Sequence, residues 1–342
     1  MITIHMTTYS RHKSGLLRAA IESVLSQDFA DFEFIVCDDA SNDGSAEYLK
    51  TVADSDPRIR ILRNERNLNN VAISLGRCLA ASDPNRQFVS WMFDDCVLRP
   101  GALDKLARRI RESPTEVLFG VTDVYLKDGS AFKVGEKSPS EIRRKIKHSS
   151  VLVPNAGIMV DRHVFDTVGW YDPSIVLRRS CDWDLFRRMI SAGISFDTIP
   201  DVLVEEHGET QTDSLRNSFT TTFDIMRRFA SARDAAGLVL NLQNCLSMPI
   251  DWIPPGDWSK DELTLIQFMF LEYFVAIADI PRAFRWAKRL ASELDKPSLS
   301  LSNLSIMSDS NNGNQSLLAA GAYCGVLLGL YKQALAERSL TA

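Results

Sequence analysis

Short apolar runs and amphipathic stretches alternate along the first hundred residues. The apolar runs predict strands, and segments whose apolar residues recur at helical spacing predict helices between them. The predicted strands cover residues 2–6, 32–37, 58–62 and 88–93, and the predicted helices cover residues 16–27 and 45–52. Because strands that alternate with helices form a parallel sheet with loops at the carboxyl ends of its strands, this pattern predicts an α/β domain.

Two acidic pairs close strands of this predicted sheet. Asp38 and Asp39 follow the second strand, and Asp94 and Asp95 follow the fourth. Strand ends of an open α/β sheet are where such folds bind ligands, and adjacent carboxylates repel each other unless a cation or several donors neutralise them. Mg²⁺ and Mn²⁺ prefer oxygen ligands and commonly share them with substrate phosphates. The structural alternatives are an Asx turn for the first pair and a turn that caps the following helix for the second.

The loop after the first predicted strand lacks the usual phosphate-binding patterns. Neither GxGxxG nor GxxxxGK[ST] occurs there, which weakens a dinucleotide-binding interpretation and removes a P-loop. Acids that close a second strand can hydrogen-bond a ribose hydroxyl or a base N–H. The first acidic pair is placed for such a contact.

The alternation continues beyond residue 101. We predict a helix at 103–112 and strands at 116–125, 151–160 and 202–208. Segment 141–148 is strongly basic. A solvated helical face is the structural interpretation of this segment, and contact with an anionic acceptor or anionic lipid headgroups is the functional one.

The pattern becomes helical after residue 215. Segments 219–241 and 262–294 have helical periodicity, and Pro281 is expected to break the second into a helical hairpin. Segment 298–316 is rich in Ser and Asn and predicts a flexible connection, and 317–338 predicts a final helix.

Composition narrows the function. The chain has 342 residues and a net charge of -5, so it lacks the basic excess of nucleic-acid-binding proteins and we expect no nucleic-acid partner. Its six cysteines include no CxxC pair, which is typical of reduced thiols in a cytoplasmic protein. No signal peptide is expected, and the longest uncharged apolar stretch is shorter than the ~20 residues that span a bilayer. We therefore expect a cytoplasmic location.

These motifs together resemble the family 2 glycosyltransferases of the GT-A fold. The resemblance covers about the first 215 residues. It rests on Thr8-Tyr9-Ser10, on segments 21–27 and 32–45, and on Phe93-Asp94-Asp95 ahead of Pro100. It implies a GT-A domain over 1–215, with a nucleotide-sugar half (1–100) and an acceptor half (101–215), followed by a helical region over 216–342.

The resemblance also implies the roles of the residues near the donor. Thr8, Tyr9 and Asp39 would lie around the base, which is best interpreted as uracil. Asp94 would lie toward the ribose, and Asp95 toward the Mn²⁺ or Mg²⁺ ion that bridges the diphosphate.

Inverting transfer needs one carboxylate to take the proton of the acceptor hydroxyl. Segment 180–189 resembles the Glu-Asp motif of the family, which implies that Asp182 is the base, although Cys181 stands where relatives commonly have Glu. The structural alternative for Asp182 is a helix N-cap. Asp184 is a weaker candidate for the base, and Trp183 is either a platform for a sugar ring or part of the core.

Three further residues complete the prediction. His207 is expected near the metal or the diphosphate, and Asn155 lies in a segment that passes beneath the acceptor in relatives. Where relatives often have Ala-Arg-Asn, this chain has the segment 69–77, so a basic contact to the diphosphate is missing unless Arg77 supplies it. An exposed helical arginine is the alternative for Arg77.

The sequence therefore predicts a metal-dependent inverting glycosyltransferase. The expected acceptor is a glycan, lipid-linked or protein-linked, of a bacterial surface polymer. Secondary expectations are peripheral contact with the inner face of the membrane and a homodimer through the C-terminal helices. Two rivals are a sugar-nucleotide pyrophosphorylase, whose glycine-rich basic loop is absent from residues 7–15, and a catalytically silent GT-A module that binds glycan or scaffolds partners.

Overall fold

The structure is a computed structural model that describes residues 1–126, 128–149, 152–177, 180–207 and 223–293. The chain divides into two compact units. The first comprises Met1–Thr220 and Gly237–Pro249, and the second comprises Thr221–Ala236 and Ile250–Ala342. The predicted boundary after Leu215 lies outside the described residues, as do the predicted connection at 298–316 and the predicted helix at 317–338.

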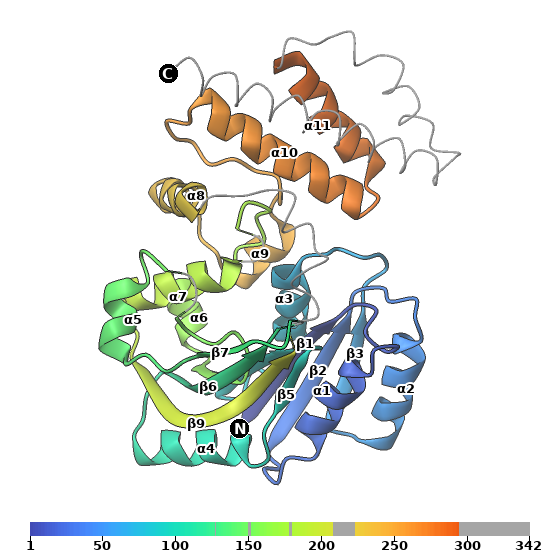
Figure 1. Ribbon diagram of the computed structural model, residues 1–342, viewed down its shortest axis with the longest axis vertical. Coiled ribbons are helices and arrows are strands. Elements are labelled where there is room, and N and C mark those ends of the chain that lie inside the picture. Colours follow the sequence, from blue (N-terminus) through green and yellow to red (C-terminus); the bar gives the residue numbers. More distant parts are fainter. Residues whose placement is uncertain (127, 150–151, 178–179, 208–222, 294–342) are drawn as a thin grey trace. The chain divides into compact units, whose positions relative to one another are not determined.

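Four parallel strands form the first half of the sheet, as predicted. From the edge inward they are β3 (Ile59–Arg63), β2 (Phe32–Asp38), β1 (Ile2–Thr8) and β4 (Phe88–Phe93). Three helices connect them, namely α1 (Leu16–Leu25), α2 (Ser45–Ser55) and α3 (Val71–Ala81). Each strand is followed by a loop at its carboxyl end, so the loops after β1, β2 and β4 are neighbours (Figure 1).

Both faces of this half are covered by helices. Ile4 and Met6 of β1 pack with Leu17 of α1 in the main hydrophobic core. Cys37 of β2 lies on the opposite face and packs with Cys78 of α3. Burial on both faces explains why these strands are nearly continuous apolar runs rather than alternating ones.

The second half of the sheet is mixed rather than parallel. Beyond β4 it continues with β8 (Ile158–Asp161), β6 (Val117–Tyr125), β9 (Phe196–His207) and β5 (Cys96–Leu98), and β7 (Ala131–Val134) pairs with β6. β8 is antiparallel to β4 and β6, β6 and β9 are parallel, and β5 is antiparallel to β9. The sequence did not predict β5, because a strand of three residues is too short to show a period.

Two predicted strands have different limits in the structure. The segment predicted as a strand at 151–160 becomes β8 only at Ile158, because Pro154 cannot donate a ladder hydrogen bond and Gly157 adopts a φ of 62°. β9 begins at Phe196, six residues before the predicted strand at 202–208.

Helices cover this half as well. They are α4 (Ala102–Glu112), α5 (Pro139–Lys145), α6 (Val164–Val168) and α7 (Cys181–Ser191). The helix predicted at 219–241 ends at Ala235 in the structure. A further helix that the sequence did not predict, α9 (Leu242–Ser247), packs on α3 in the first unit. The backbone N–H of Trp170 donates to the carbonyl of Leu240 at 2.6 Å. The segment 237–249 thereby completes the core of the sheet unit.

The second unit is helical within the described residues. It contains α8 (Phe223–Ala235), α10 (Lys260–Ala276) and α11 (Ile280–Glu293). Ser259 and Glu262 form a capping box that begins α10. The chain reverses at Ala278, whose φ is 56°, so the predicted helical hairpin is confirmed. None of the helices among the described residues combines the length and apolar character needed to cross a bilayer.

Replacing Gly169 with alanine should disrupt the contact that holds segment 237–249. A Cβ atom at Gly169 would lie 2.3 Å from the carbonyl oxygen of Leu240, and its φ of 75° disfavours side chains. Gly193 has a φ of 81° but no atom within 4 Å of its Cβ position, which makes it a matched control. We expect Gly193→Ala to lower the free energy of unfolding by about 1–2 kcal/mol. We expect Gly169→Ala to lower it by about 1–3 kcal/mol more, measured by urea denaturation. Equal losses would contradict a tight contact at Leu240.

Candidate functional site

The two acidic pairs lie next to each other at the carboxyl ends of adjacent strands. Thr8 at the end of β1 is aligned with Asp38, and the neighbouring Thr7 is aligned with Phe93 of β4. The loop after β1 joins the pairs, because the Asp39 N–H donates to the Thr8 carbonyl at 2.9 Å and the Tyr9 N–H donates to Asp94 Oδ2 at 3.1 Å. The predicted clustering of acids at this sheet edge is therefore what the structure shows.

The contacts of Asp38 indicate a structural role. Its carboxylate is almost fully buried, accepts from the Ser41 N–H at 3.0 Å and forms an ion pair with Arg63. Arg63 also donates to the Ser41 carbonyl at 2.8 Å. The Asx-turn interpretation fits Asp38, whose carboxylate holds the turn that follows β2.

Asp39 holds the loop that precedes α3. Its carboxylate accepts from Asn64 Nδ2 at 2.6 Å and from the backbone N–H groups of Leu68 at 2.9 Å and Asn69 at 2.8 Å. A carboxylate has about four acceptor positions, so these three bonds leave one for a further donor. Asp39 is only 6% exposed, so a further donor could reach its carboxylate only through this small exposed part.

Arg77 acts through Asn64. It is half-buried and donates to Asn64 Oδ1, while Asn64 Nδ2 donates to Asp39. The prediction of an exposed helical arginine is therefore wrong. An Asn amide with its oxygen engaged by a guanidinium must present its NH₂ elsewhere, so Arg77 orients the Asn64 donor toward Asp39.

Asp94 and Asp95 are two adjacent, largely buried carboxylates that repel each other. The Asp94 side chain is 13% exposed and Asp95 is 9% exposed. Burial, together with the negative charge of Asp95, raises the pKa of Asp94 from 3.8 to about 7, while the nearby Arg11 at 3.9 Å opposes this shift. The capping alternative is wrong, because β5 intervenes before α4 and Gly101 is the N-cap of that helix.

This pair suits a hard divalent cation. Its oxygens are of the ligand type that Mg²⁺ and Mn²⁺ prefer, and a cation would relieve the repulsion that shifts the Asp94 pKa. Within the described ranges, no three His, Cys, Asp or Glu side chains converge as a complete metal site. Mg²⁺ commonly binds through one or two carboxylates and takes its other ligands from substrate phosphates and water, so the two carboxylates of this pair are of a suitable kind and number.

His207 lies beside the pair through its backbone. Its N–H donates to the Asp95 carbonyl at 2.8 Å. Its ring stacks on Tyr125 with centroids 5.6 Å apart, and Nε2 is 3.6 Å from Glu205. The structure brings His207 next to Asp95, and the described ring contacts are with Tyr125 and Glu205.

Asp182 lies in the first turn of α7, as expected. Ser180 is the N-cap of this helix, so the N-cap alternative for Asp182 is wrong. Asp182 is half-buried, and its negative charge contributes to raising the pKa values of the buried Tyr171 and Cys181, for which burial is the main cause. The Asp182 carboxylate is therefore at the start of the helix and is not sealed in the core.

The contacts of Asp184 and Trp183 indicate that both residues have structural roles. Asp184 is fully buried and accepts from Arg187 at 2.8 Å and Arg188 at 2.9 Å. Arg188 also donates to the Trp170 carbonyl at 2.7 Å, which fixes α7 against the preceding loop. Trp183 is fully buried and donates to the Ile146 carbonyl at 2.7 Å, so it is core rather than a sugar platform.

Asn155 connects β4 to the segment before α7. Its Oδ1 accepts from Trp91 Nε1 at 3.0 Å and from the Tyr171 hydroxyl at 3.1 Å. Because an indole N–H only donates, the amide orientation is fixed and the NH₂ group points away from Trp91. The Asn155 side chain as a whole is half-buried.

Sequence reasoning missed several residues of this site. Three of the four non-glycine residues with positive φ in the described chain lie here, namely Ser10 at 54°, Ala40 at 63° and Asn69 at 45°. Such backbone is costly and concentrates at functional sites. Asn64 directly follows the third strand, β3. This position at a strand end is the one feature of the sequence that could have indicated its role in the site.

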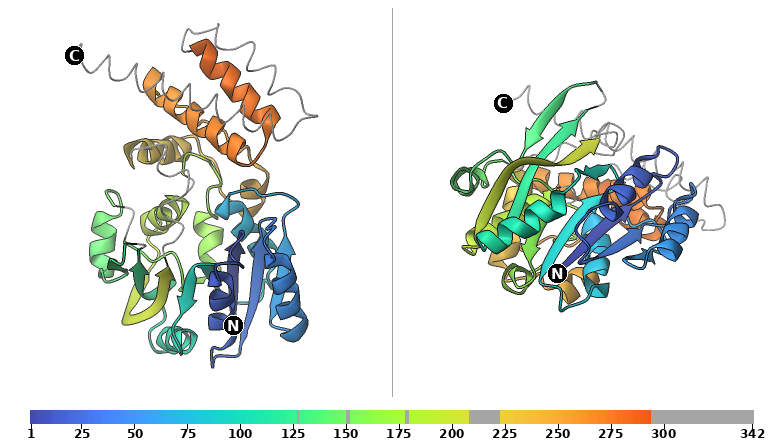
Figure 2. Two further views of the ribbon diagram at one scale, coloured as in Figure 1. Left: turned by 45° about the vertical axis from the view of Figure 1, so that its right-hand side comes forward. Right: turned by 90° about the horizontal axis from the view of Figure 1, so that it is seen from below.

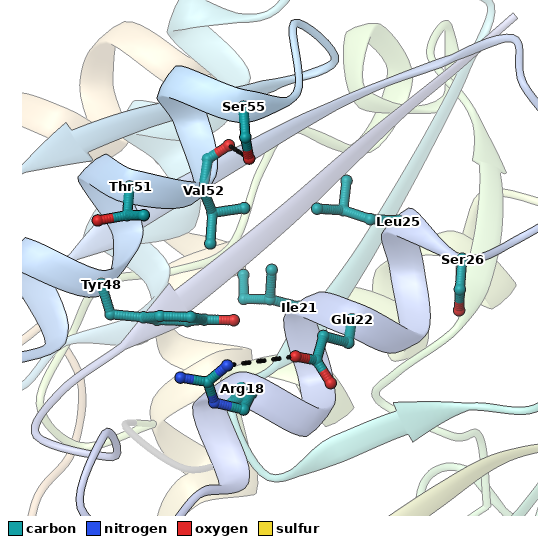
Figure 3. A pocket seen from close by; sticks show the side chains of 9 residues that line it. All are labelled: Arg18, Ile21, Glu22, Leu25, Ser26, Tyr48, Thr51, Val52 and Ser55. Atoms are coloured by element: carbon teal, nitrogen blue, oxygen red, sulfur yellow. Dashed lines mark hydrogen bonds and ion pairs between the residues drawn. The ribbon is translucent and has the colours of Figure 1, made fainter.

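A separate cavity of about 510 Å³ lies between α1 and α2 (Figure 3). Apolar side chains of Ile21, Leu25 and Val52 line it, and the Arg18–Glu22 ion pair, 3.5 Å long, lies at its edge. None of the strand-end residues described above lines this cavity, so it does not belong to the acidic site.

The basic segment 141–148 is a largely solvated helical face, as its structural interpretation predicted.

Comparison with known proteins identifies the fold that carries this site. Residues 3–169 match the model of Glycosyl transferase family 2. The chain belongs to this family. It is therefore a glycosyltransferase, and the match favours this enzyme class over the pyrophosphorylase alternative.

Two curated relatives and one solved structure illustrate the family relationship. An uncharacterized glycosyltransferase of Methanocaldococcus jannaschii is 26% identical over 211 residues, which cover 60% of this chain and 70% of the relative. A GalNAc(5)-diNAcBac-PP-undecaprenol beta-1,3-glucosyltransferase of Campylobacter jejuni is 30% identical over 155 residues, 42% of this chain and 46% of the relative. TarS of Staphylococcus aureus, in complex with UDP-GlcNAc, has a TM-score of 0.54 at 13% identity, covering 97% of this chain and 92% of that one. The predicted GT-A fold of this family 2 glycosyltransferase is confirmed.

Asp94→Asn should stabilise the metal-free protein at pH 8. The folded-state pKa of about 7 lies above the ordinary value of 3.8, so the folded protein loses stability as pH rises from about 4 to 7. Asparagine keeps an acceptor for the Tyr9 N–H and removes the charge. We expect a gain in the free energy of unfolding of at most about 4 kcal/mol at pH 8, falling toward pH 4, from urea denaturation with a chelator. An equal gain at pH 5 and pH 8 would show that Asp94 titrates as an ordinary carboxylate.

Proposed function

We propose that this glycosyltransferase transfers a sugar from a UDP-linked donor to a hydroxyl of a glycan acceptor, with inversion at the anomeric carbon. The observation that carries the proposal is the buried Asp94–Asp95 pair at the end of β4, whose repulsion a cation would relieve. Such a reaction also needs recognition of the donor base, which Asp39 would supply, and a general base, which would be Asp182 at the start of α7.

The donor nucleotide would occupy the ends of β1 and β2. Tyr9 is 44% exposed and offers a ring face to a base, whereas Thr8 is almost fully buried beside Asp39. The remaining acceptor position of Asp39 would take the N–H edge of uracil. Asp94 would accept from the ribose. The binding of UDP-GlcNAc by TarS, a protein of the same fold, supports a UDP-linked donor.

A divalent cation at Asp95 would stabilise the charge that develops on the leaving diphosphate. Asp95 holds its carboxylate beside Asp94, and the backbone of His207 fixes the Asp95 carbonyl. Mn²⁺ and Mg²⁺ both suit these oxygen ligands. We retain His207 as a candidate ligand, because it lies next to Asp95 along the β9 edge.

Asp182 would act as the general base. As the acceptor oxygen forms its bond to the anomeric carbon, its proton passes to the Asp182 carboxylate, and the bond from that carbon to the diphosphate oxygen breaks. Asp184 and its two arginines hold α7, which keeps the base in position. Cys181 is buried, and burial raises the pKa of its thiol, so it cannot supply the charge of the usual Glu.

The acceptor we propose is a lipid-linked glycan of a surface polymer. The name of the Campylobacter relative gives an undecaprenol-linked glycan as its substrate, which supports this class. The NH₂ group of Asn155, whose orientation Trp91 fixes, would donate to a hydroxyl of the acceptor.

Asp182→Asn should remove turnover while leaving donor affinity intact. Loss of a general base lowers the rate by about 10²–10⁴-fold. The measurement is UDP release from the UDP-sugar that the wild type hydrolyses or transfers, together with calorimetric UDP binding in Mn²⁺. Asp166→Asn, at an exposed position of α6, is the matched control for loss of one charge and should leave the rate unchanged. Turnover of the Asp182→Asn protein within a few-fold of wild type would refute the assignment of the base.

A further inference from the structure

Tyr125 lies at the end of β6, next to the end of β9. It is aligned with His207 of the parallel strand β9, and the two rings stack with an interplanar angle of 17°. The His207 N–H donates in turn to the Asp95 carbonyl. One stacked ring and one backbone hydrogen bond therefore connect Tyr125 to Asp95.

Tyr125 and the nucleotide residues lie on opposite sides of the Asp94–Asp95 pair. Asp94 contacts Tyr9 after β1, whereas Asp95 contacts His207 at the end of β9. In the sheet order, β2 and β3 lie on one side of β1 and β4, and β6 and β9 lie on the other. A group bound on Tyr125 would approach the carboxylates from the side away from the base.

The Tyr125 ring is exposed although it belongs to a strand whose other residues are mostly buried. It is 38% exposed, compared with 2% for its neighbour Val124. The β6–β7 hairpin projects from the sheet at this point (Figure 2). His207 supports the Tyr125 ring by stacking, and Glu205 lies 3.6 Å from His207.

An aromatic ring beside carboxylates matches the chemistry of a sugar. One face of a pyranose is lined by C–H groups that pack on an aromatic ring, and its hydroxyls donate to carboxylates. Glu205 forms an ion pair with Arg99 and lies 3.6 Å from His207, so charged hydrogen-bonding groups lie close to the Tyr125 ring. A free anion would be repelled by the Asp94–Asp95 pair.

We propose that Tyr125 is the platform on which the acceptor sugar stacks, with its ring face toward the acceptor. This inference rests on the proposed function, because it names a subsite for the acceptor of that reaction. Tyr125 would set the acceptor affinity, and donor binding would not depend on it.

Phe132 provides a matched control on the same hairpin. It is 41% exposed, similar to Tyr125, but it is aligned with Val124, and so it lies on the opposite face of the hairpin from Tyr125. Truncating Phe132 therefore tests whether a change in hairpin stability alone affects sugar binding.

The test is saturation-transfer NMR with methyl β-glycosides of glucose, galactose, N-acetylglucosamine and N-acetylgalactosamine, in the presence of UDP and the diamagnetic ion Mg²⁺. We expect wild type to saturate the C–H protons of one face of at least one glycoside. Tyr125→Ala should weaken this signal by about tenfold, while Tyr125→Phe, Tyr125→Trp and Phe132→Ala should retain it.

The inference fails if no glycoside gives a signal with wild type, if Tyr125→Ala leaves the signal unchanged, or if Phe132→Ala reduces it equally. It also fails if Tyr125→Ala weakens the UDP signal in the same spectra, because Tyr125 would then act through His207 on the donor side. Absence of a UDP signal from wild type would instead refute the proposed function, so the two failures can be told apart.

Discussion

Two adjacent carboxylates that are largely withdrawn from water are the main electrostatic constraint on this site. Burial and mutual repulsion raise the pKa of Asp94 to about 7, so the metal-free fold bears an electrostatic penalty at neutral pH. A fold retains such a penalty when a ligand relieves it. The parallel arrangement of β1 and β4 places the pair where a diphosphate and its cation can reach it.

The rest of the site is a set of supports for that pair. Arg77 orients Asn64, which fixes Asp39 on the nucleotide side. Asp184 and Arg188 fix α7 on the acceptor side. Asn64 and Asp39 follow different strands, and Arg188 of α7 donates to the carbonyl of Trp170, whose N–H donates to Leu240. The geometry therefore depends on the whole sheet unit, including segment 237–249. Polar residues with satisfied partners are well suited to such supports, because their removal would leave buried charge unpaired.

The sequence predicted the parts of the fold that depend on local patterns. The first half of the sheet followed from apolar runs, and the acids at strand ends followed from the position of those runs. Trp183 could not be assigned from sequence, because an apolar residue at a helix start suits both a core and a platform. The role of Arg77 depends on a tertiary contact with Asn64, and the short strand β5 has no detectable period. The sequence predicts Tyr125 only as the end of a strand, because its exposure depends on how the β6–β7 hairpin projects from the sheet. The assignments of Thr8, Tyr9, Asp94, Asp95 and His207 to ligands stay predictions.

The most direct test of this account is calorimetric titration of the full chain with UDP, once with Mn²⁺ and once with a chelator. The account predicts measurable UDP binding with Mn²⁺ and a large loss of affinity with the chelator, because the carboxylate pair repels the diphosphate unless a cation bridges them. Equal UDP affinity under the two conditions would contradict the assignment of the pair to a metal. Absence of UDP binding with Mn²⁺ would contradict the proposed donor.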